Sequence, residues 1–86
     1  MNFTIVWSNA ALQDLARIWT AVADRNAVTQ ASNQIDQMLS RDAQYVGESR
    51  VGNQRVAFAD PLGVRFDVVV DDLMVTIGAV WLTRQV

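Results

Sequence analysis

The sequence predicts an α+β fold with the element order β-α-α-β-β-β, in which a helical hairpin covers one face of a largely antiparallel four-stranded sheet. Three observations support this prediction. A short alternating apolar segment comes first, two segments of helical periodicity follow, and residues 51–82 hold three strand-like segments separated by turn residues. The 86 residues, 51% of them hydrophobic, suffice for one two-layer core. We therefore expect a single domain that spans residues 1–86.

The first predicted strand covers residues 2–7, where Phe3, Ile5 and Trp7 alternate with other side chains. Ser8 follows as a helix N-cap, because its hydroxyl can accept a hydrogen bond from a free N–H in the first helical turn. The next apolar residues recur at helical spacing, so a first helix is expected to bury one stripe and expose the other. The stripe consists of Leu12, Leu15, Trp19 and Val22, and the outward side includes Gln13, Asp14, Arg17 and Thr20.

A second helix is predicted over residues 26–40. Its apolar stripe consists of Val28, Ala31, Ile35, Met38 and Leu39. One continuous helix is the alternative, because no Gly or Pro separates the two segments. The apolar phase breaks at residues 24–26, however, which favours a helical hairpin.

The last third of the chain contains the remaining three predicted strands, at residues 54–59, 64–70 and 73–82. Residues 41–52 before them have no sustained periodicity and hold two of the four glycines, so they are expected to form a loop. Residues 60–63 and the pair Asp71-Asp72 supply the two turns between the strands.

A two-residue turn at Asp71-Asp72 would set the register of the last hairpin and place Arg65 opposite Gly78, with open space above the glycine. The apolar pairs in this register are Val68 with Val75, Phe66 with Ile77, and Val64 with Ala79. A longer turn with a bulge is the alternative, and it would shift the register by one residue.

The register of the preceding strand depends on the connection at Pro61. Matching apolar residues pairs Phe58 with Val64, and this places Arg55 opposite Asp67 as a cross-strand ion pair. The second face of the sheet would then combine an arginine patch with apolar residues. Because a solvated sheet face is normally polar, we expect a partner, possibly a second copy of the chain, to cover it. The apolar residues on or near this face are Ala57, Ala59, Val69, Met74, Val80 and Leu82.

The composition excludes several classes of site. The chain has no cysteine and no histidine, so zinc sites, thiolate sites and histidine-based triads are not expected, and neither is a cofactor. All seven basic residues are arginines, and the net charge of −2 argues against a broad nucleic-acid surface. Residues 3–7 are too short an apolar run for a secretory signal, and residues 73–82 are too short to span a bilayer, so we expect a cytoplasmic protein.

Several short motifs run in order through nearly the whole chain. They are Val6-Trp7-Ser8, Ala11, Asp14-Leu15, Ile35-Asp36, Leu39, Pro61-Leu62-Gly63-Val64-Arg65-Phe66, and Asp71-Asp72 before Val75 and Ile77. In these motifs the chain resembles the RelE/ParE superfamily of toxins from type II toxin–antitoxin systems, which includes plasmid stabilisation proteins. The resemblance implies a small α+β toxin that a cognate antitoxin neutralises.

The resemblance leaves the mechanism open. RelE-like members cleave mRNA in the ribosome without a metal, whereas ParE-like members inhibit DNA gyrase by contact; a degenerate member would do neither. The basic positions of the RelE-like site match Arg55, Arg65 and Arg84, which we take as candidate catalytic residues. Because arginine is a poor proton donor and acceptor at neutral pH, Glu48 or Asp67 would have to supply acid–base chemistry.

Three other assignments concern aromatic and terminal residues. Trp7 and Trp19 are expected in the core, since each lies on an apolar stripe. Trp81 could stack on a base or contact an antitoxin. Arg84 could instead belong to a frayed tail.

Overall fold

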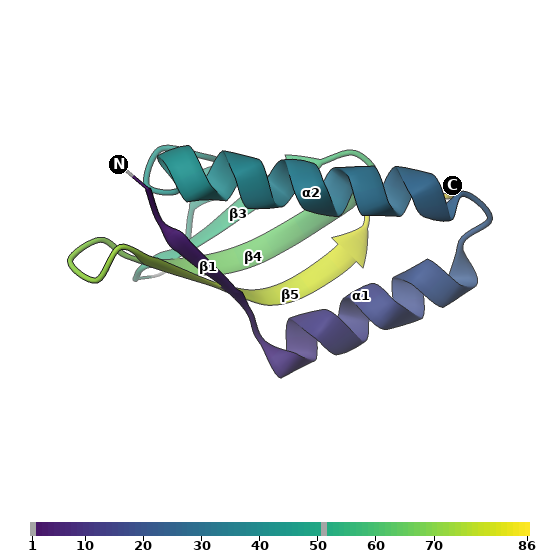
Figure 1. Cartoon of the computed structure of the whole chain (residues 1–86), viewed down its shortest axis with the longest axis horizontal. Helices are drawn as coiled ribbons and strands as arrows, with labels where there is room; N and C mark the ends of the chain where they lie inside the picture. The colour runs from purple at the N-terminus through teal and green to yellow at the C-terminus, as the bar shows by residue number, and fades with distance from the viewer. Residues whose placement is uncertain (1, 51) are drawn as a thin grey trace.

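The computed structural model describes residues 2–50 and 52–86. Met1 and Val51, which belong to the predicted domain and the predicted loop, lie outside the described residues. The helices and strands follow the predicted order, with one addition (Figure 1). They are β1 (Thr4–Trp7), α1 (Asn9–Ala21), α2 (Arg25–Asp42), β2 (Glu48–Ser49), β3 (Gln54–Ala59), β4 (Leu62–Val69) and β5 (Met74–Leu82). The predicted α+β fold is therefore confirmed.

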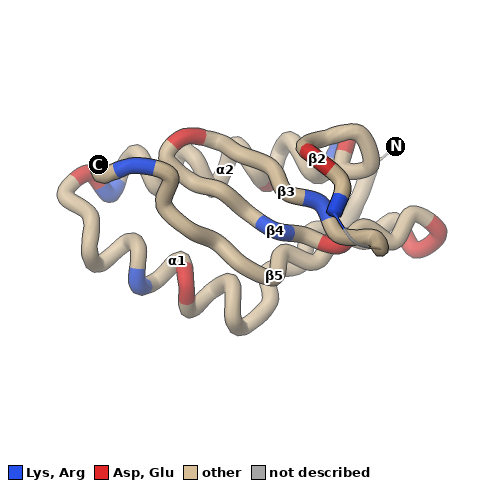
Figure 2. The backbone as a smooth tube through the Cα atoms, turned by 180° about the vertical axis from the view of Figure 1, so that it is seen from behind, with Lys and Arg blue, Asp and Glu red and all other residues tan. Residues whose placement is uncertain are grey.

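The sheet has five strands in the described part of the chain, in the order β1-β5-β4-β3-β2, rather than the predicted four. β1 runs parallel to β5, and the other neighbours are antiparallel. The additional strand, β2, lies in the segment predicted as a loop, because two residues are too few to produce a recognisable alternation. The helices lie on one face of the sheet, and Figure 2 shows the opposite face, which we call the outer face.

The helical hairpin forms as predicted. The Ser8 hydroxyl accepts a hydrogen bond from the Ala11 N–H at 3.1 Å, and the Asp24 carboxylate caps α2 by accepting from the Ala27 N–H at 3.1 Å. Val22 at the end of α1 is extended, which separates the two helices. Among the described residues, no helix is long and apolar enough to cross a membrane.

The core lies between α2 and the sheet. Its largest fully buried side chains are Phe66, Ile35, Leu39, Leu62, Ile77, Val28, Val64 and Val75. α1 packs along β5, and its contact with α2 is limited, so only Ala11 in α1 is fully buried. Consequently the prediction that Trp19 lies in the core is wrong, because 43% of its surface is exposed. Trp7 does pack against the core.

The predicted register of β4 against β5 is confirmed near the turn that joins them, and it is wrong further along the two strands. Phe66 pairs with Ile77 as predicted, but a bulge follows, so that Arg65 pairs with Ala79 and not with Gly78. Val64 likewise pairs with Val80. The bulge adds one residue to β5, and the alternation of apolar residues carries no signal for it.

The predicted register of β3 is wrong by one residue. The turn at Asp60-Pro61, whose peptide bond is cis, pairs Ala59 directly with Leu62, whereas the prediction assumed a longer turn through Gly63. Arg55 therefore pairs with Phe66 on the helix-covered side and not with Asp67. The same shift buries two residues that had been assigned to the second face, Ala57 and Ala59. Val80 is buried because of the bulge in β5, which places it opposite Val64, and only Val69 and Met74 of the residues assigned to the second face are strongly exposed.

Candidate functional site

The outer face of the sheet carries an aromatic pair at the end near Pro61. Gly63 lies between Phe58 on β3 and Trp81 on β5 in the strand register. The two rings meet edge to face, with centroids 6.2 Å apart and an angle of 81° between their planes. A Cβ on Gly63 would lie 2.6 Å from the Trp81 indole, so the missing side chain lets the indole rest on β4. Phe58 remains 58% exposed.

Arg65 is the next outward-facing residue along β4 after Gly63, roughly 7 Å further along the strand. Its guanidinium extends over Gly78, because Nη2 lies 3.2 Å from the position that a Cβ would occupy there. The predicted open space above this glycine is thus filled by Arg65 itself. Within the described residues, no hydrogen bond or ion pair engages the guanidinium of this exposed arginine. Arg65 is therefore available to an external carboxylate or phosphate.

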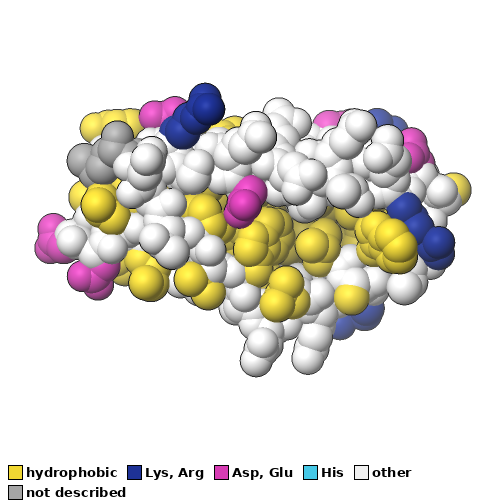
Figure 3. Space-filling view, in the orientation of Figure 1, with side chains coloured by type: hydrophobic (Ala, Val, Ile, Leu, Met, Phe, Trp, Pro, Cys, Tyr) yellow, Lys and Arg dark blue, Asp and Glu magenta, His cyan; other side chains and the backbone are white. Residues whose placement is uncertain are grey.

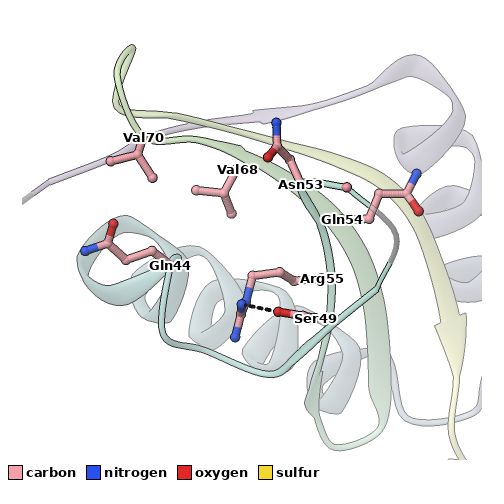
Figure 4. A pocket seen from close by; sticks show the side chains of 8 residues that line it. Gln44, Ser49, Asn53, Gln54, Arg55, Val68 and Val70 are labelled. Atoms are coloured by element: carbon pink, nitrogen blue, oxygen red, sulfur yellow. Dashed lines mark hydrogen bonds between the residues drawn. The ribbon is translucent and has the colours of Figure 1, made fainter.

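Arg55 is engaged in the structure of the β2 loop. Its guanidinium donates to the Val46 carbonyl at 2.8 Å and to the Gly47 carbonyl at 3.0 Å. It also donates to the Ser49 hydroxyl at 2.8 Å, as Figure 4 shows. Gly47 fits here because its φ is +72° and a Cβ would lie 2.0 Å from the Val56 carbonyl oxygen. Arg55 also borders a shallow pocket of about 170 Å³. Its donors are used mainly to hold this loop against β3.

Arg84 forms a bidentate ion pair with Asp60 beyond the end of β5. Nε lies 2.9 Å from Oδ1, and Nη2 lies 2.7 Å from Oδ2. The hydrogen bonds lower the pKa of Asp60 below its usual value and raise the pKa of Arg84. The carbonyl of Val86 also accepts hydrogen bonds from the N–H groups of Ala23 and Asp24. The interpretation of this segment as a frayed tail is therefore wrong.

The structure does not bring the three candidate catalytic arginines together. Arg65 is on the outer face, Arg55 is turned toward the β2 loop, and Arg84 is paired beyond β5. Figure 2 shows basic residues on the neighbouring strands β3 and β4 and another basic segment near the C-terminus, at the other end of the sheet. Of the candidate acid–base groups, Glu48 forms an exposed ion pair with Arg50 at 3.1 Å, and Asp67 lies two residues after Arg65 on β4.

A second exposed apolar surface lies between α1 and α2, where Figure 3 shows hydrophobic side chains in a band. Leu12 and Leu15 line two shallow hollows of about 310 and 210 Å³ along it, and Trp19 lines the larger one. The Trp7 indole N–H donates to the Asp36 carboxylate at 3.3 Å, and the Arg25 guanidinium lies 4.7 Å from the centre of a Trp19 ring. We call this surface the helix groove.

The outward position of Phe58 and the exposed helix groove were not predicted from the sequence. The helical pattern placed Leu12 and Trp19 on a buried stripe, and it could not show that α1 lies beside α2 with little contact. Phe58 was paired with Val64 on the core face. The correct pairing with Gly63 would have identified the aromatic pair, because a glycine between two aromatic residues on adjacent strands leaves room for a ring.

No protein-family model matches the sequence, and no curated protein matches it closely. Several solved structures, however, match its fold. A chain of the RelBE2 toxin–antitoxin complex from Mycobacterium tuberculosis aligns with a TM-score of 0.77 and 16% identity, over 95% of this chain and 92% of that one. A chain of the chromosomal ParDE system of P. aeruginosa aligns with a TM-score of 0.71 and 18% identity, over 95% and 97%.

The isolated RelE toxin of E. coli aligns with a TM-score of 0.69 and 10% identity, over 100% of this chain and 88% of that one. At such low identities the likeness concerns the fold. It extends over nearly the full length of each pair. The chain therefore has the fold of the RelE/ParE toxins, as its sequence motifs implied.

Proposed function

We propose that the chain is the toxin of a type II toxin–antitoxin module and that a cognate antitoxin neutralises it. The observation that carries this proposal is the fold likeness to RelE and to chains of the RelBE2 and ParDE systems, which spans 95–100% of this chain. The exposed apolar surfaces give further support. Leu12 and Trp19 in the helix groove and Phe58 on the outer face are 43–58% exposed, and an antitoxin would bury such side chains.

We further propose that the toxin acts by contact with a target protein, as ParE-like toxins do with gyrase. The exposed Phe58 and Arg65 and the half-buried Trp81 form an aromatic and arginine surface, and Trp and Arg are among the residue types that dominate binding energy at protein interfaces. Two of the three candidate catalytic arginines already have partners in the fold, which favours binding over catalysis.

Cleavage of mRNA on the ribosome is the second candidate function. The unpaired Arg65 guanidinium could stabilise charge on a phosphate, and the Phe58–Trp81 pair could stack on a base. In this alternative Asp67 would supply the acid–base chemistry that arginine cannot. The same outer face would then contact the ribosome and its mRNA.

Inducible expression in a bacterial host tests the toxin proposal. We expect growth arrest, and we expect co-expression of the protein encoded by the adjacent reading frame to relieve it. Arg65→Ala should weaken the arrest, whereas Arg41→Ala, at an exposed position on α2, serves as the matched control and should not. Normal growth despite soluble, folded protein would refute the toxin proposal, and full toxicity of Arg65→Ala would exclude a role for Arg65.

Assays with purified protein separate the two mechanisms. Contact inhibition predicts that the chain blocks gyrase supercoiling at near-stoichiometric concentration and leaves ribosome-bound mRNA intact. Cleavage of that mRNA, lost in Arg65→Ala, would instead support the endoribonuclease. Growth arrest with neither effect would show that the chain has another target.

A further inference from the structure

The turn between β4 and β5 extends beyond the rest of the sheet and carries an unusual cluster of exposed apolar residues (Figure 1). We call this cluster the hairpin patch. It consists of Val6, Val69, Leu73 and Met74, each 38–41% exposed. Figure 3 shows hydrophobic and acidic side chains together at this end of the molecule.

The hairpin patch combines residues of β1, β4 and the segment leading into β5, whereas the Val70 side chain lies on the other side of the hairpin, where it lines a pocket with Val68. Val69 and Met74 are cross-strand partners, and Met74 also pairs with Thr4 on β1, two residues before Val6. Val70 and Leu73 close the turn through a hydrogen bond of 3.0 Å from the Leu73 N–H to the Val70 carbonyl. Contiguous exposed apolar surface of this kind is typical of a binding site.

Leu73 occupies a turn position whose backbone conformation is unfavourable for leucine. Its φ is +50°, in the left-handed region that favours glycine or asparagine. A leucine there strains the backbone, and its side chain remains 38% exposed. The side chain therefore contributes to the surface rather than to the fold.

The charges nearest the hairpin patch are acidic, and the first basic residue, Arg65, lies two residues beyond Asp67 on β4 with its guanidinium over Gly78. Asp71 and Asp72 occupy the turn, and Asp67 precedes Val69 on the outward side of β4. Among residues 2–50 and 52–86, no salt bridge engages any of these three exposed carboxylates. A partner must therefore offer apolar side chains together with positive charge.

This charge pattern selects one class of partner. Two copies of the chain meeting symmetrically through the patch would bring their aspartates together, and an anionic membrane surface would repel them. We propose that the hairpin patch binds a cationic amphipathic segment of a partner protein, in which leucine-like side chains alternate with Lys or Arg. This inference does not depend on the toxin proposal, which uses other surfaces.

Chemical-shift mapping on the ¹⁵N-labelled chain tests the proposal. The probes are short synthetic peptides of alternating Leu and Lys, alternating Leu and Glu, and alternating Ser and Lys. The Leu/Lys peptide should perturb residues 69–74 and β1, and salt should weaken its binding. The other two peptides should bind at least about tenfold more weakly, since each lacks one of the two required properties.

Two variants and a control make the test specific. Leu73→Gly removes apolar surface while suiting the turn, so it should weaken Leu/Lys binding several-fold without lowering the stability of the chain. The double variant Asp71→Lys/Asp72→Lys should reverse the preference toward the Leu/Glu peptide. Phe58→Ala, which removes an exposed apolar side chain at the opposite end of the sheet, should leave Leu/Lys binding unchanged.

Four results would overturn the proposal. The first is no binding of the Leu/Lys peptide, and the second is equal binding of the Leu/Lys and Leu/Glu peptides. The third is perturbation centred on the helix groove or on Phe58 and Trp81 instead of the patch. The fourth is a concentration-dependent dimer of the free chain that Leu73→Gly dissociates, or binding to anionic vesicles that it abolishes.

Discussion

The carboxylate of Asp14 accepts a hydrogen bond from the backbone N–H of Val80 at 3.1 Å, although 66 residues separate the two in sequence. β1 ends at Trp7, opposite Ile77, so β5 continues without a neighbouring strand on that side. α1 packs there instead, and Asp14 supplies the acceptor that a strand would have offered. One side chain on a helix thus completes the hydrogen bonding of a sheet.

We predict that Asp14→Ala lowers the free energy of unfolding by about 1–3 kcal/mol, because the Val80 N–H loses its partner in a buried position. Asp14→Asn retains a side-chain carbonyl and should cost less. Urea denaturation of both variants provides the measurement, and amide hydrogen exchange at Val80 provides a local one. Equal destabilisation by the two substitutions would show that the hydrogen bond is not the cause.

Replacement of Gly63 by alanine should displace the Trp81 indole, because the new Cβ would lie 2.6 Å from it. Overpacking of this kind costs about 1–3 kcal/mol. Near-ultraviolet circular dichroism and tryptophan fluorescence would report the altered contact with Phe58. The control is Gly78→Ala, whose Cβ would approach only the flexible end of Arg65, at 3.2 Å, and should perturb the aromatic signal little.

Arg55→Lys should destabilise the β2 loop although it preserves the charge. The three nitrogens of the planar guanidinium donate to Val46, Gly47 and Ser49. A lysine ammonium cannot reach all three acceptors in this geometry, so at least one of them loses its hydrogen bond. We expect a loss of about 1–3 kcal/mol, with faster amide exchange in residues 46–49. Unchanged exchange there would mean that the guanidinium does not hold the loop.

The ion pair between Asp60 and Arg84 should make stability depend on pH in the acid range. Since the folded state lowers the pKa of Asp60, the pair stabilises the fold above the ordinary carboxyl value of 3.8. This contribution is lost as the pH falls through the pKa of folded Asp60, below which Arg84→Gln and wild type should be equally stable. The effect is modest because both side chains are exposed.

Carboxyl-carbon NMR titration measures this directly. Arg84→Gln should raise the pKa of Asp60 toward its ordinary value, and added salt should do the same in the wild-type chain. An Asp60 pKa that is identical in the two proteins would contradict the pairing.

The helices and strands with a strong local sequence pattern could be predicted. The register between strands could not, because it depends on turns and bulges that leave only a weak pattern. The bounds predicted for the strand at residues 54–59 match β3, and the Ser8 N-cap marked the start of α1. The placement of Arg55 failed because its face depended on the number of residues in the turn at Pro61. A shift of one residue moves every side chain of a strand to the other face.

The candidate site was harder to predict, since it depends on contacts between distant segments. Arg65 was correctly assigned to the uncovered side of β4, because the buried residues on either side of it fixed its direction. The partners of Arg55 and Arg84 lie in loops whose path the sequence does not specify. Trp19 was misplaced because periodicity identifies an apolar stripe but not the element that covers it.

The pairing of β1 with β5 also has a consequence during biosynthesis. Ribosomes deliver β1 and α1 first and β5 last among the strands, yet β5 is the neighbour that β1 and α1 require. Such long-range contacts slow folding, and here they cannot begin until residues 74–82 have been translated. The apolar residues of β1 and α1 therefore find their sheet partner only when synthesis of the chain is nearly finished, and the sheet is completed late.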